Sequence, residues 1–177
     1  MEIARIRPVD LAQDASAIEA IDTGFTTSES YHVTSDGSSF SLELMTLDRP
    51  ISKRFPLDDL RGEARPWSDA WVAEDGGRIV GFVAVGFEPW NRRLVIWHLY
   101  VDTGRRGQGT GRTLLAAAKA HGRAKGARSL WLETSSLNAP GVAAYRSMGF
   151  ALTGVDLTLY DGTPAAGETA LFFSRAL

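Results

Sequence analysis

Val101-Asp-Thr-Gly-Arg-Arg-Gly-Gln-Gly-Thr-Gly-Arg-Thr-Leu-Leu115 is the stretch that decides the fold. It leaves an expected strand, passes four glycines and enters an expected helix at Thr110. Glycine adopts positive φ and lets the backbone approach a ligand closely. The N–H groups of such a turn, together with a helix N-terminus, cradle an anion, and Arg105, Arg106 and Arg112 add positive charge. The stretch therefore predicts a phosphate-bearing ligand; the alternative is a tight turn without one.

Two common phosphate-binding motifs do not fit this stretch. A Walker loop ends in Gly-Lys-Ser/Thr, whereas Gly111 is followed by Arg112 and Thr113. The dinucleotide fingerprint needs a third glycine three residues after Gly109, and Arg112 occupies that position. The ligand is therefore expected to be a different phosphate compound.

Hydrophobic periodicity predicts a β-rich first part and then alternating helices and strands. Strands are expected at residues 3–7, 40–47, 70–74, 79–87, 94–101, 129–134, 151–160 and 169–174. Helices are expected at 110–125 and 138–148, and a short one is capped by Asp14 or Ser16. Residues 25–31 and 48–67 read as loops, the second with one short helix, and Asp75-Gly76-Gly77 reads as a turn. The order predicts a single α/β (α+β) domain over residues 1–177.

Composition excludes several classes of protein. With 44% hydrophobic and 23% charged residues, the chain can bury a core. No apolar run approaches a membrane span and the first residues lack a secretory signal, so we expect a cytoplasmic protein that binds no membrane. The chain has no cysteine and three histidines, so neither a thiol nucleophile nor a metal site is expected. A net charge of −2 disfavours nucleic-acid binding.

Charge is divided unevenly along the chain. Residues 1–75 hold 15 acidic and 7 basic residues, and residues 76–177 hold 6 acidic and 12 basic ones. One interpretation is ordinary surface scatter. The other is that the second part holds an anionic ligand and the first part attracts a cationic one, with Glu29, Glu43 and the Asp58-Asp59 pair as candidates.

The segment Arg106-Gly-Gln-Gly-Thr-Gly111 resembles the Arg/Gln-x-x-Gly-x-Gly/Ala motif of the GCN5-related N-acetyltransferases. Trp131-Leu-Glu-Thr134, Asn138-Ala139 and Ala144–Phe150 continue the resemblance, which extends over residues 79–150. It implies a central mixed, mainly antiparallel sheet flanked by helices, with splayed strands that hold acetyl-CoA as co-substrate. The binding core is expected at about residues 70–151.

The resemblance also implies which residues bind acetyl-CoA. The pantetheine arm is expected beside Leu99 and Val101, and Asn138 matches a residue that contacts the arm and can also cap a helix. The pyrophosphate is expected on the loop residues Arg106, Gly107, Gly109, Thr110, Gly111 and Arg112.

Acetyl transfer to an amine requires a base for the amine proton and an acid for the departing thiolate. Tyr145 matches the family's acid; alternatively it is a core residue on one helix face with Val142 and Met148. Glu133 is the candidate base. Its alternatives are a salt-bridged or substrate-orienting carboxylate, with a water chain accepting the proton.

The C-terminal part resembles streptothricin acetyltransferases, which acetylate an amine on a cationic antibiotic. Trp90-Asn-Arg-Arg93, Leu159-Tyr-Asp-Gly-Thr163 and Glu168-Thr-Ala-Leu-Phe-Phe173 carry this resemblance. Those enzymes have adjacent acidic residues where this chain has Trp97-His98. We expect Trp97 in the core rather than as a substrate shelf; His98 is either a neutral strand residue or a substitute base.

The sequence therefore predicts an N-acetyltransferase acting on a primary amine of a small cationic molecule, with a streptothricin-like antibiotic as one candidate. An alternative acceptor is the amine of a protein or peptide. A different class, a non-catalytic acyl-CoA sensor, is the third hypothesis. Relatives in the family are often homodimers, and no feature of this sequence identifies a subunit interface.

Overall fold

The computed structural model describes residues 4–62 and 64–177. The chain forms two compact units. The first unit contains the residues up to Gly24, Arg54–Trp131 and Ala176–Leu177, and the second contains Phe25–Lys53 and Leu132–Arg175. Whether residues 1–177 act as one domain stays a prediction.

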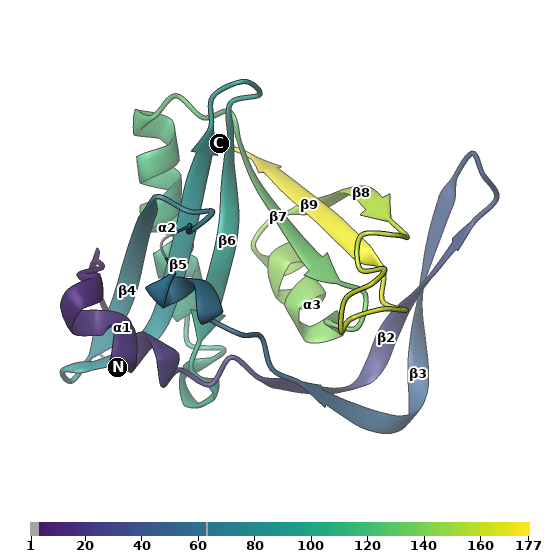
Figure 1. Ribbon diagram of the computed structural model, residues 1–177, viewed down its shortest axis with the longest axis horizontal. Helices are drawn as coiled ribbons and strands as arrows, with labels where there is room; N and C mark the ends of the chain where they lie inside the picture. The colour runs from purple at the N-terminus through teal and green to yellow at the C-terminus, as the bar shows by residue number, and fades with distance from the viewer. Residues whose placement is uncertain (1–3, 63) are drawn as a thin grey trace. The chain divides into compact units, whose positions relative to one another are not determined.

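The first unit is a sheet with helices on both faces (Figure 1). Its strands follow the order β1-β4-β5-β6-β7; neighbours are antiparallel except for β6 and β7, which are parallel. The strands are β1 (Arg5–Pro8), β4 (Asp69–Asp75), β5 (Arg78–Glu88), β6 (Arg93–Val101) and the beginning of β7 (Ser129–Ser135). The helices are α1 (Leu11–Glu19), α2 (Thr110–Ala124) and the short 3₁₀ turns η1 (Asp58–Arg61) and η2 (Thr103–Arg105).

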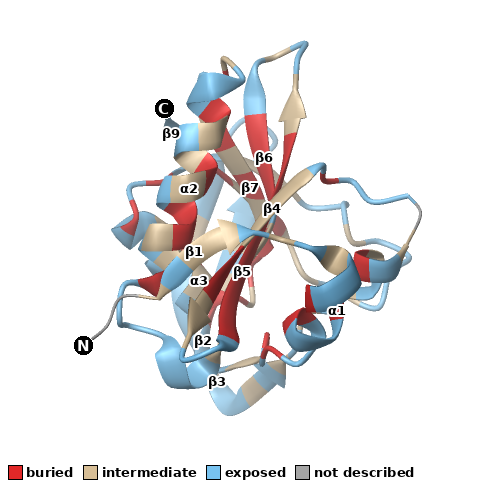
Figure 2. Ribbon diagram, turned by 90° about the vertical axis from the view of Figure 1, so that its left-hand side faces the viewer, coloured by how far each residue is buried: buried red, intermediate tan, exposed pale blue. Residues whose placement is uncertain are grey.

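Strand β5 is the centre of the first unit's core, and Figure 2 shows it buried along most of its length. Phe82 and Ala84 join the cluster that packs under α1 and η1. On the other face, a Cβ on Gly81 would lie 2.9 Å from Leu114 of α2, so the glycine permits close packing of helix on strand. Because both faces are covered, β5 reads as a continuous apolar run.

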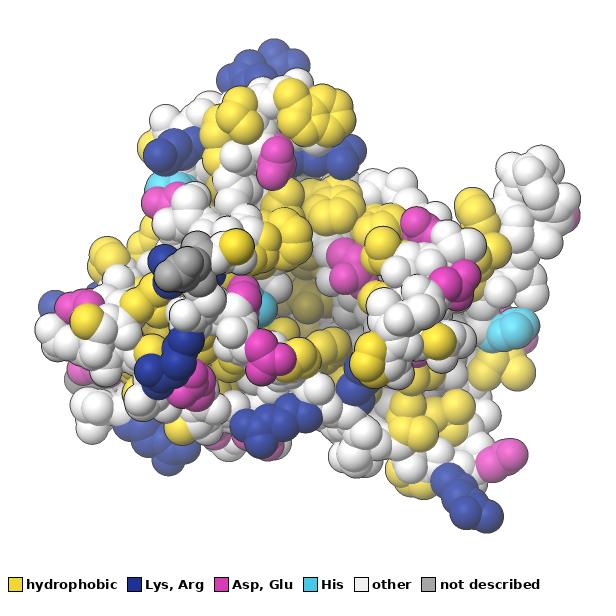
Figure 3. Space-filling view, in the orientation of Figure 1, with side chains coloured by type: hydrophobic (Ala, Val, Ile, Leu, Met, Phe, Trp, Pro, Cys, Tyr) yellow, Lys and Arg dark blue, Asp and Glu magenta, His cyan; other side chains and the backbone are white. Residues whose placement is uncertain are grey.

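The second unit contains a two-stranded hairpin and a group of three strands. The hairpin consists of β2 (Phe25–Ser35) and β3 (Phe40–Lys53), and the three strands follow the order β7-β9-β8. Helix α3 (Ala139–Ser147) lies between β7 and β8 (Ala151–Asp156) in sequence, and β9 (Ala170–Ala176) pairs antiparallel with β8. Figure 3 shows hydrophobic and charged side chains interspersed along the hairpin, and Phe40, Leu44 and Met45 are exposed.

The predicted loop at residues 25–31 is wrong, since these residues form β2. The hairpin is largely solvated, so its Ser, Thr and Glu residues show no apolar alternation. Strand β3 also extends six residues further than predicted, to Lys53, past Pro50. Its register with β2 breaks between Thr27 and Glu29, and Pro50 falls in the unpaired part, where its missing N–H removes no ladder bond.

Two predicted boundaries are corrected by local side-chain hydrogen bonds. Asp10, rather than Asp14 or Ser16, caps α1 by accepting from the Ala12 N–H at 3.0 Å, because Asp14 lies inside the first turn and pairs with Arg7. Strand β8 ends at Asp156 instead of residue 160. The Asp156 carboxylate accepts from the N–H of Thr158 at 2.8 Å and starts a turn.

The remaining strands and helices lie within a few residues of their predicted positions, the part of the first strand at residue 3 lying outside the described residues. None of the helices in the described part of the chain is long and apolar enough to cross a membrane. Residues 4–62 and 64–177 contain no group of three or more acidic or histidine side chains suited to a metal ion.

Candidate active site

The glycine-rich loop of the first unit is an open backbone turn at the start of α2. Gly107 and Gly109 have φ of +75° and +90°, and a Cβ on either would have no protein atom within 4 Å. Gly109 is the N-cap of α2 and has no side chain, so the first-turn N–H groups at Thr110 and Gly111 receive no side-chain cap. Unsatisfied N–H groups facing open space suit an anion.

Arg106 is an exposed residue that holds this loop through two hydrogen bonds to backbone carbonyls. Its Nε donates to the Val101 carbonyl at 2.9 Å, and its Nη2 donates to the Asp22 carbonyl at 3.0 Å. Arg105 forms an ion pair with Asp75. These contacts tie both side chains to the loop and its neighbours, and the predicted role of the two arginines in supplying charge to phosphate oxygens stays a prediction.

Strand β6 pairs along its length with β5 but over only three residues with β7, as a splayed strand requires. Leu99 and Val101 pair with Val83 and Gly81 of β5. On its other side β6 pairs with β7 only over Arg93–Val95, so Leu99 and Val101 lie beyond that ladder.

Trp97 does not lie in the core, as the sequence analysis expected. The register between β5 and β6 shifts at this residue, since Ala84 pairs with His98 and Val85 pairs with Ile96. Trp97 is the extra residue of a β-bulge, and its side chain is 44% exposed. A Cβ on Gly86 would lie 3.2 Å from its Nε1, so that glycine leaves room for the indole.

His98, the next residue of β6, pairs with Asp59 of η1. Its Nε2 lies 2.8 Å from Asp59 Oδ2, and the same carboxylate oxygen accepts from Trp67 Nε1 at 2.6 Å. The His98 ring stacks on Phe82 with centroids 5.8 Å apart. Its Nδ1 is buried and has no hydrogen-bond partner within the described ranges. Asp59 therefore supplies a carboxylate beside the strand where the acidic pair is missing.

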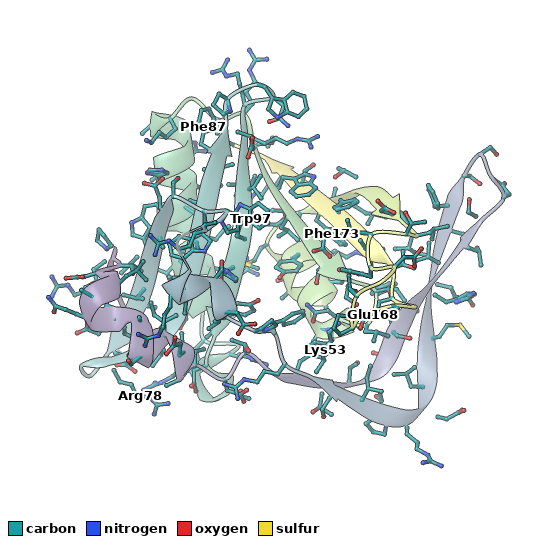
Figure 4. The ribbon with its side chains drawn as sticks, viewed as in Figure 1. Lys53, Arg78, Phe87, Trp97, Glu168 and Phe173 are labelled. Atoms are coloured by element: carbon teal, nitrogen blue, oxygen red, sulfur yellow. The ribbon has the colours of Figure 1, made fainter. Side chains whose placement is uncertain are left out.

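The second unit contains a half-buried cluster of charged and hydroxyl groups around Glu133 of β7. The Tyr160 hydroxyl donates to Oε1 of Glu133. Lys53 Nζ, at the end of β3, pairs with Oε2 of Glu168, and Figure 4 shows these two side chains pointing toward each other. Ser135 Oγ donates to the same Glu168 oxygen.

Burial raises the pKa of the Glu133 carboxyl above its ordinary value, and the nearby Glu168 charge raises it further. The Tyr160 hydrogen bond and the positive charge of Lys53 act in the opposite direction. Glu133 is therefore a carboxylate whose proton affinity is increased, as a base for an amine requires.

Tyr145 lies on α3, where it packs in the core and also carries a hydroxyl that can act as an acid. It packs against Phe150 and Phe173, with centroids 6.1 Å and 6.3 Å away, and shares its helix face with the buried Val142 and Met148. Burial and then the negative charge of Glu133 raise the pKa of its hydroxyl to about 12. The hydroxyl therefore keeps its proton at neutral pH and can donate it.

Asn138 is the N-cap of α3. Its Oδ1 accepts from the Gly141 N–H at 3.0 Å, and its Nδ2 donates to Thr134 Oγ1 at 2.9 Å. The side chain is 6% exposed, so these internal bonds occupy it.

Lys53, Tyr160 and Glu168 are site residues that the sequence does not predict. Tyr160 and Glu168 belong to motifs shared with the streptothricin acetyltransferases, but nothing in the sequence places them beside Glu133. Lys53 gives no signal, because it lies at the end of a strand in a segment whose composition predicts a loop.

Comparison with known proteins agrees with this fold. The profile of the "Acetyltransferase (GNAT) family" matches residues 39–150. A streptothricin acetyltransferase of Streptomyces lavendulae is 41% identical over 169 residues, covering 91% of this chain and 89% of the relative. The crystal structure of a nourseothricin acetyltransferase has a TM-score of 0.89 at 43% identity, with 99% of both chains covered.

A third comparison concerns the fold alone. A Bacillus anthracis protein solved with acetyl coenzyme A has a TM-score of 0.82 at 22% identity, covering 98% of this chain and 99% of that one. The chain belongs to the GNAT acetyltransferase family, and its predicted mixed, mainly antiparallel fold is confirmed. It is an acetyl-CoA-dependent N-acetyltransferase, which also confirms the predicted enzyme class and co-substrate.

Proposed function

We propose that the enzyme acetylates a primary amine of a streptothricin-like cationic antibiotic. The names of the relatives at 41% and 43% identity support this acceptor class. The observation that carries the mechanism is that Glu133 and Tyr145 are neighbours in the second unit. The negative charge of Glu133 raises the pKa of the Tyr145 hydroxyl.

Glu133 is the proposed base and Tyr145 the proposed acid. The neutral amine attacks the acetyl carbonyl; the C–N bond forms, the C–S bond breaks, and the proton lost by the amine goes to Glu133. The Tyr145 hydroxyl, which is protonated at neutral pH, donates its proton to the departing thiolate.

Acetyl-CoA supplies the activated acetyl thioester, and the residues of the glycine loop fit it. The open turn at Gly107, Gly109, Thr110 and Gly111, with Arg112 as the next residue, would receive the pyrophosphate on backbone N–H groups. In this proposal Arg106 holds the loop in shape.

The same proposal gives Leu99 and Val101 the pantetheine arm, because they lie beyond the β6–β7 ladder. Asn138 would act on the arm indirectly, by fixing the start of α3.

Two features of the first unit support a cationic acceptor despite the missing acidic pair. Trp97 presents an exposed indole, and an aromatic face attracts an ammonium group. Asp59 provides a carboxylate beside His98. Together they would replace part of the attraction that adjacent acidic residues give a polycation.

The test is release of free thiol from acetyl-CoA with a panel of amines, each with a no-enzyme control. The panel contains streptothricin, lysine, polyamines, aminoglycosides and peptides with free N-termini. We expect the highest kcat/KM with streptothricin. Faster release with the peptides would support the alternative acceptor and refute the antibiotic, and equal, slow release with every amine would refute both.

A further inference from the structure

We propose that Tyr160, together with the Lys53–Glu168 ion pair, positions Glu133 and sets its charge state for acetyl transfer. The inference rests on the proposed role of Glu133 as base. It assigns a function to three further residues: Lys53 at the end of β3, and Tyr160 and Glu168 in the segment between β8 and β9.

The Glu133 carboxylate is oriented by a hydrogen bond from Tyr160. The Tyr160 hydroxyl donates to Oε1 of Glu133. This hydrogen bond fixes the orientation of the carboxylate from one side. Tyr160 can hold this position because β8 ends at Asp156 and the chain turns there.

Glu133 is surrounded by groups that change its proton affinity in opposite directions. Three titratable groups act on it: Tyr160 and Glu168 from the segment between β8 and β9, and Lys53 from β3. Glu133 in turn acts on Tyr145 of α3, whose pKa it raises. Glu133 and Glu168 carry two negative charges against the single positive charge of Lys53. The Lys53 ammonium and the Ser135 hydroxyl both bind Glu168 Oε2, which keeps Glu168 in place as a fixed charge.

These contacts have opposite signs, which makes the inference testable. The Tyr160 hydrogen bond and the Lys53 charge lower the pKa of Glu133, whereas the Glu168 charge raises it. Removing the first two should therefore leave Glu133 protonated at higher pH. Removing the Glu168 charge should let Glu133 lose its proton at lower pH.

The experiment is the pH profile of kcat/KM for wild type, Tyr160→Phe, Lys53→Met and Glu168→Gln, with one acceptor at fixed ionic strength. We expect the acid limb to move to higher pH in the first two variants and to lower pH in the third. On that limb, kcat/KM should fall on the order of tenfold in Tyr160→Phe, as expected for a lost hydrogen bond to a charged group. The acceptor amine titrates identically throughout, so differences arise in the enzyme.

Matched controls make the same chemical changes elsewhere. Tyr31→Phe removes a hydroxyl that Arg146 binds at 3.2 Å, Lys125→Met removes an exposed charge on the first unit, and Asp48→Asn removes an exposed carboxylate on β3. None of these should move the acid limb. Thermal unfolding and acetyl-CoA binding are measured for every variant, so that lost folding is separated from a shifted profile.

Glu133→Gln separates the inference from the function on which it rests. If the acid limb survives in Glu133→Gln, the base is wrong and the inference falls with it. If the limb disappears in Glu133→Gln while Tyr160→Phe and Lys53→Met leave it in place, Glu133 remains the base and the positioning role is refuted. If the acid limb moved in the same direction in all three variants, the positioning role would also be refuted. Such a result would indicate a general structural disturbance, whereas the role requires the direction to follow the charge that is removed.

Discussion

Gly109 provides the sharpest test of the phosphate cradle, through the variant Gly109→Val. Its φ of +90° disfavours any side chain, and the strain should lower the free energy of unfolding by ~1–2 kcal/mol. No protein atom lies within 4 Å of the added Cβ, so no further clash within the protein is expected. The side chain would instead fill the space in which the pyrophosphate is proposed to lie.

The effect on binding follows from the N–H groups that the side chain would shield. Losing one or two hydrogen bonds to a charged phosphate amounts to about 3 kcal/mol, which corresponds to a roughly 100-fold weaker Kd. Isothermal titration with acetyl-CoA measures this Kd directly, and denaturant unfolding measures the strain.

Gly77→Val is the matched control. Gly77 has φ of +77°, an equally open Cβ position and a place in the turn between β4 and β5 of the same unit. Its variant should show similar strain and an unchanged Kd. If Gly109→Val bound acetyl-CoA as tightly as Gly77→Val, the cradle would not lie at this loop.

Three further predictions concern other parts of the site and the core. Tyr145→Phe should lower kcat by about 100-fold or more, with the Kd for acetyl-CoA unchanged; an unaltered kcat would remove Tyr145 as the acid. Trp97→Ala should raise KM for a cationic acceptor about fivefold, since part of the indole is exposed; an unchanged KM would mean that it does not touch the acceptor. Arg7 lowers the pKa of Asp14 below its ordinary value, so the pair stabilises the fold at neutral pH and this contribution disappears as pH falls through the folded-state pKa. Asp14→Asn should therefore lose about 2–3 kcal/mol at pH 7 and much less in strong acid. Glu19→Gln, at the exposed pair with Arg61, should lose less, and equal losses would contradict the argument.

The parts of the fold that could be predicted are those where one residue pattern has one physical meaning. The apolar run of β5, the Asp75-Gly76-Gly77 turn and the Gly-rich entry to α2 were identified because burial on both faces and positive φ restrict the residues allowed. The hairpin of β2 and β3 was not identified in full. The first part of β3 was predicted from its alternation, whereas β2 is held by pairing with β3 and exposes polar side chains, so periodicity gives no signal there.

The site divides in a similar way. Glu133, Tyr145, Asn138 and the loop glycines could be proposed because they lie within contiguous motifs. The residues around Glu133 could not be predicted, because they come from distant parts of the sequence. Lys53 and Glu168, for example, are 115 residues apart and meet only in the fold.

The β-bulge at Trp97 could not be predicted from the sequence either. An alternating pattern assigns each residue to a face, and a register shift moves one residue to the other face without changing the sequence pattern.

The most direct test of the central claim is to incubate streptothricin and acetyl-CoA with the enzyme and to identify the product by mass spectrometry and NMR. The account predicts one added acetyl group on a primary amine of the antibiotic, formed rapidly by wild type and slowly by Glu133→Gln and Tyr145→Phe. Unmodified antibiotic in the presence of an enzyme that binds acetyl-CoA would contradict the proposed acceptor. Equal rates in all three proteins would contradict the proposed catalytic residues.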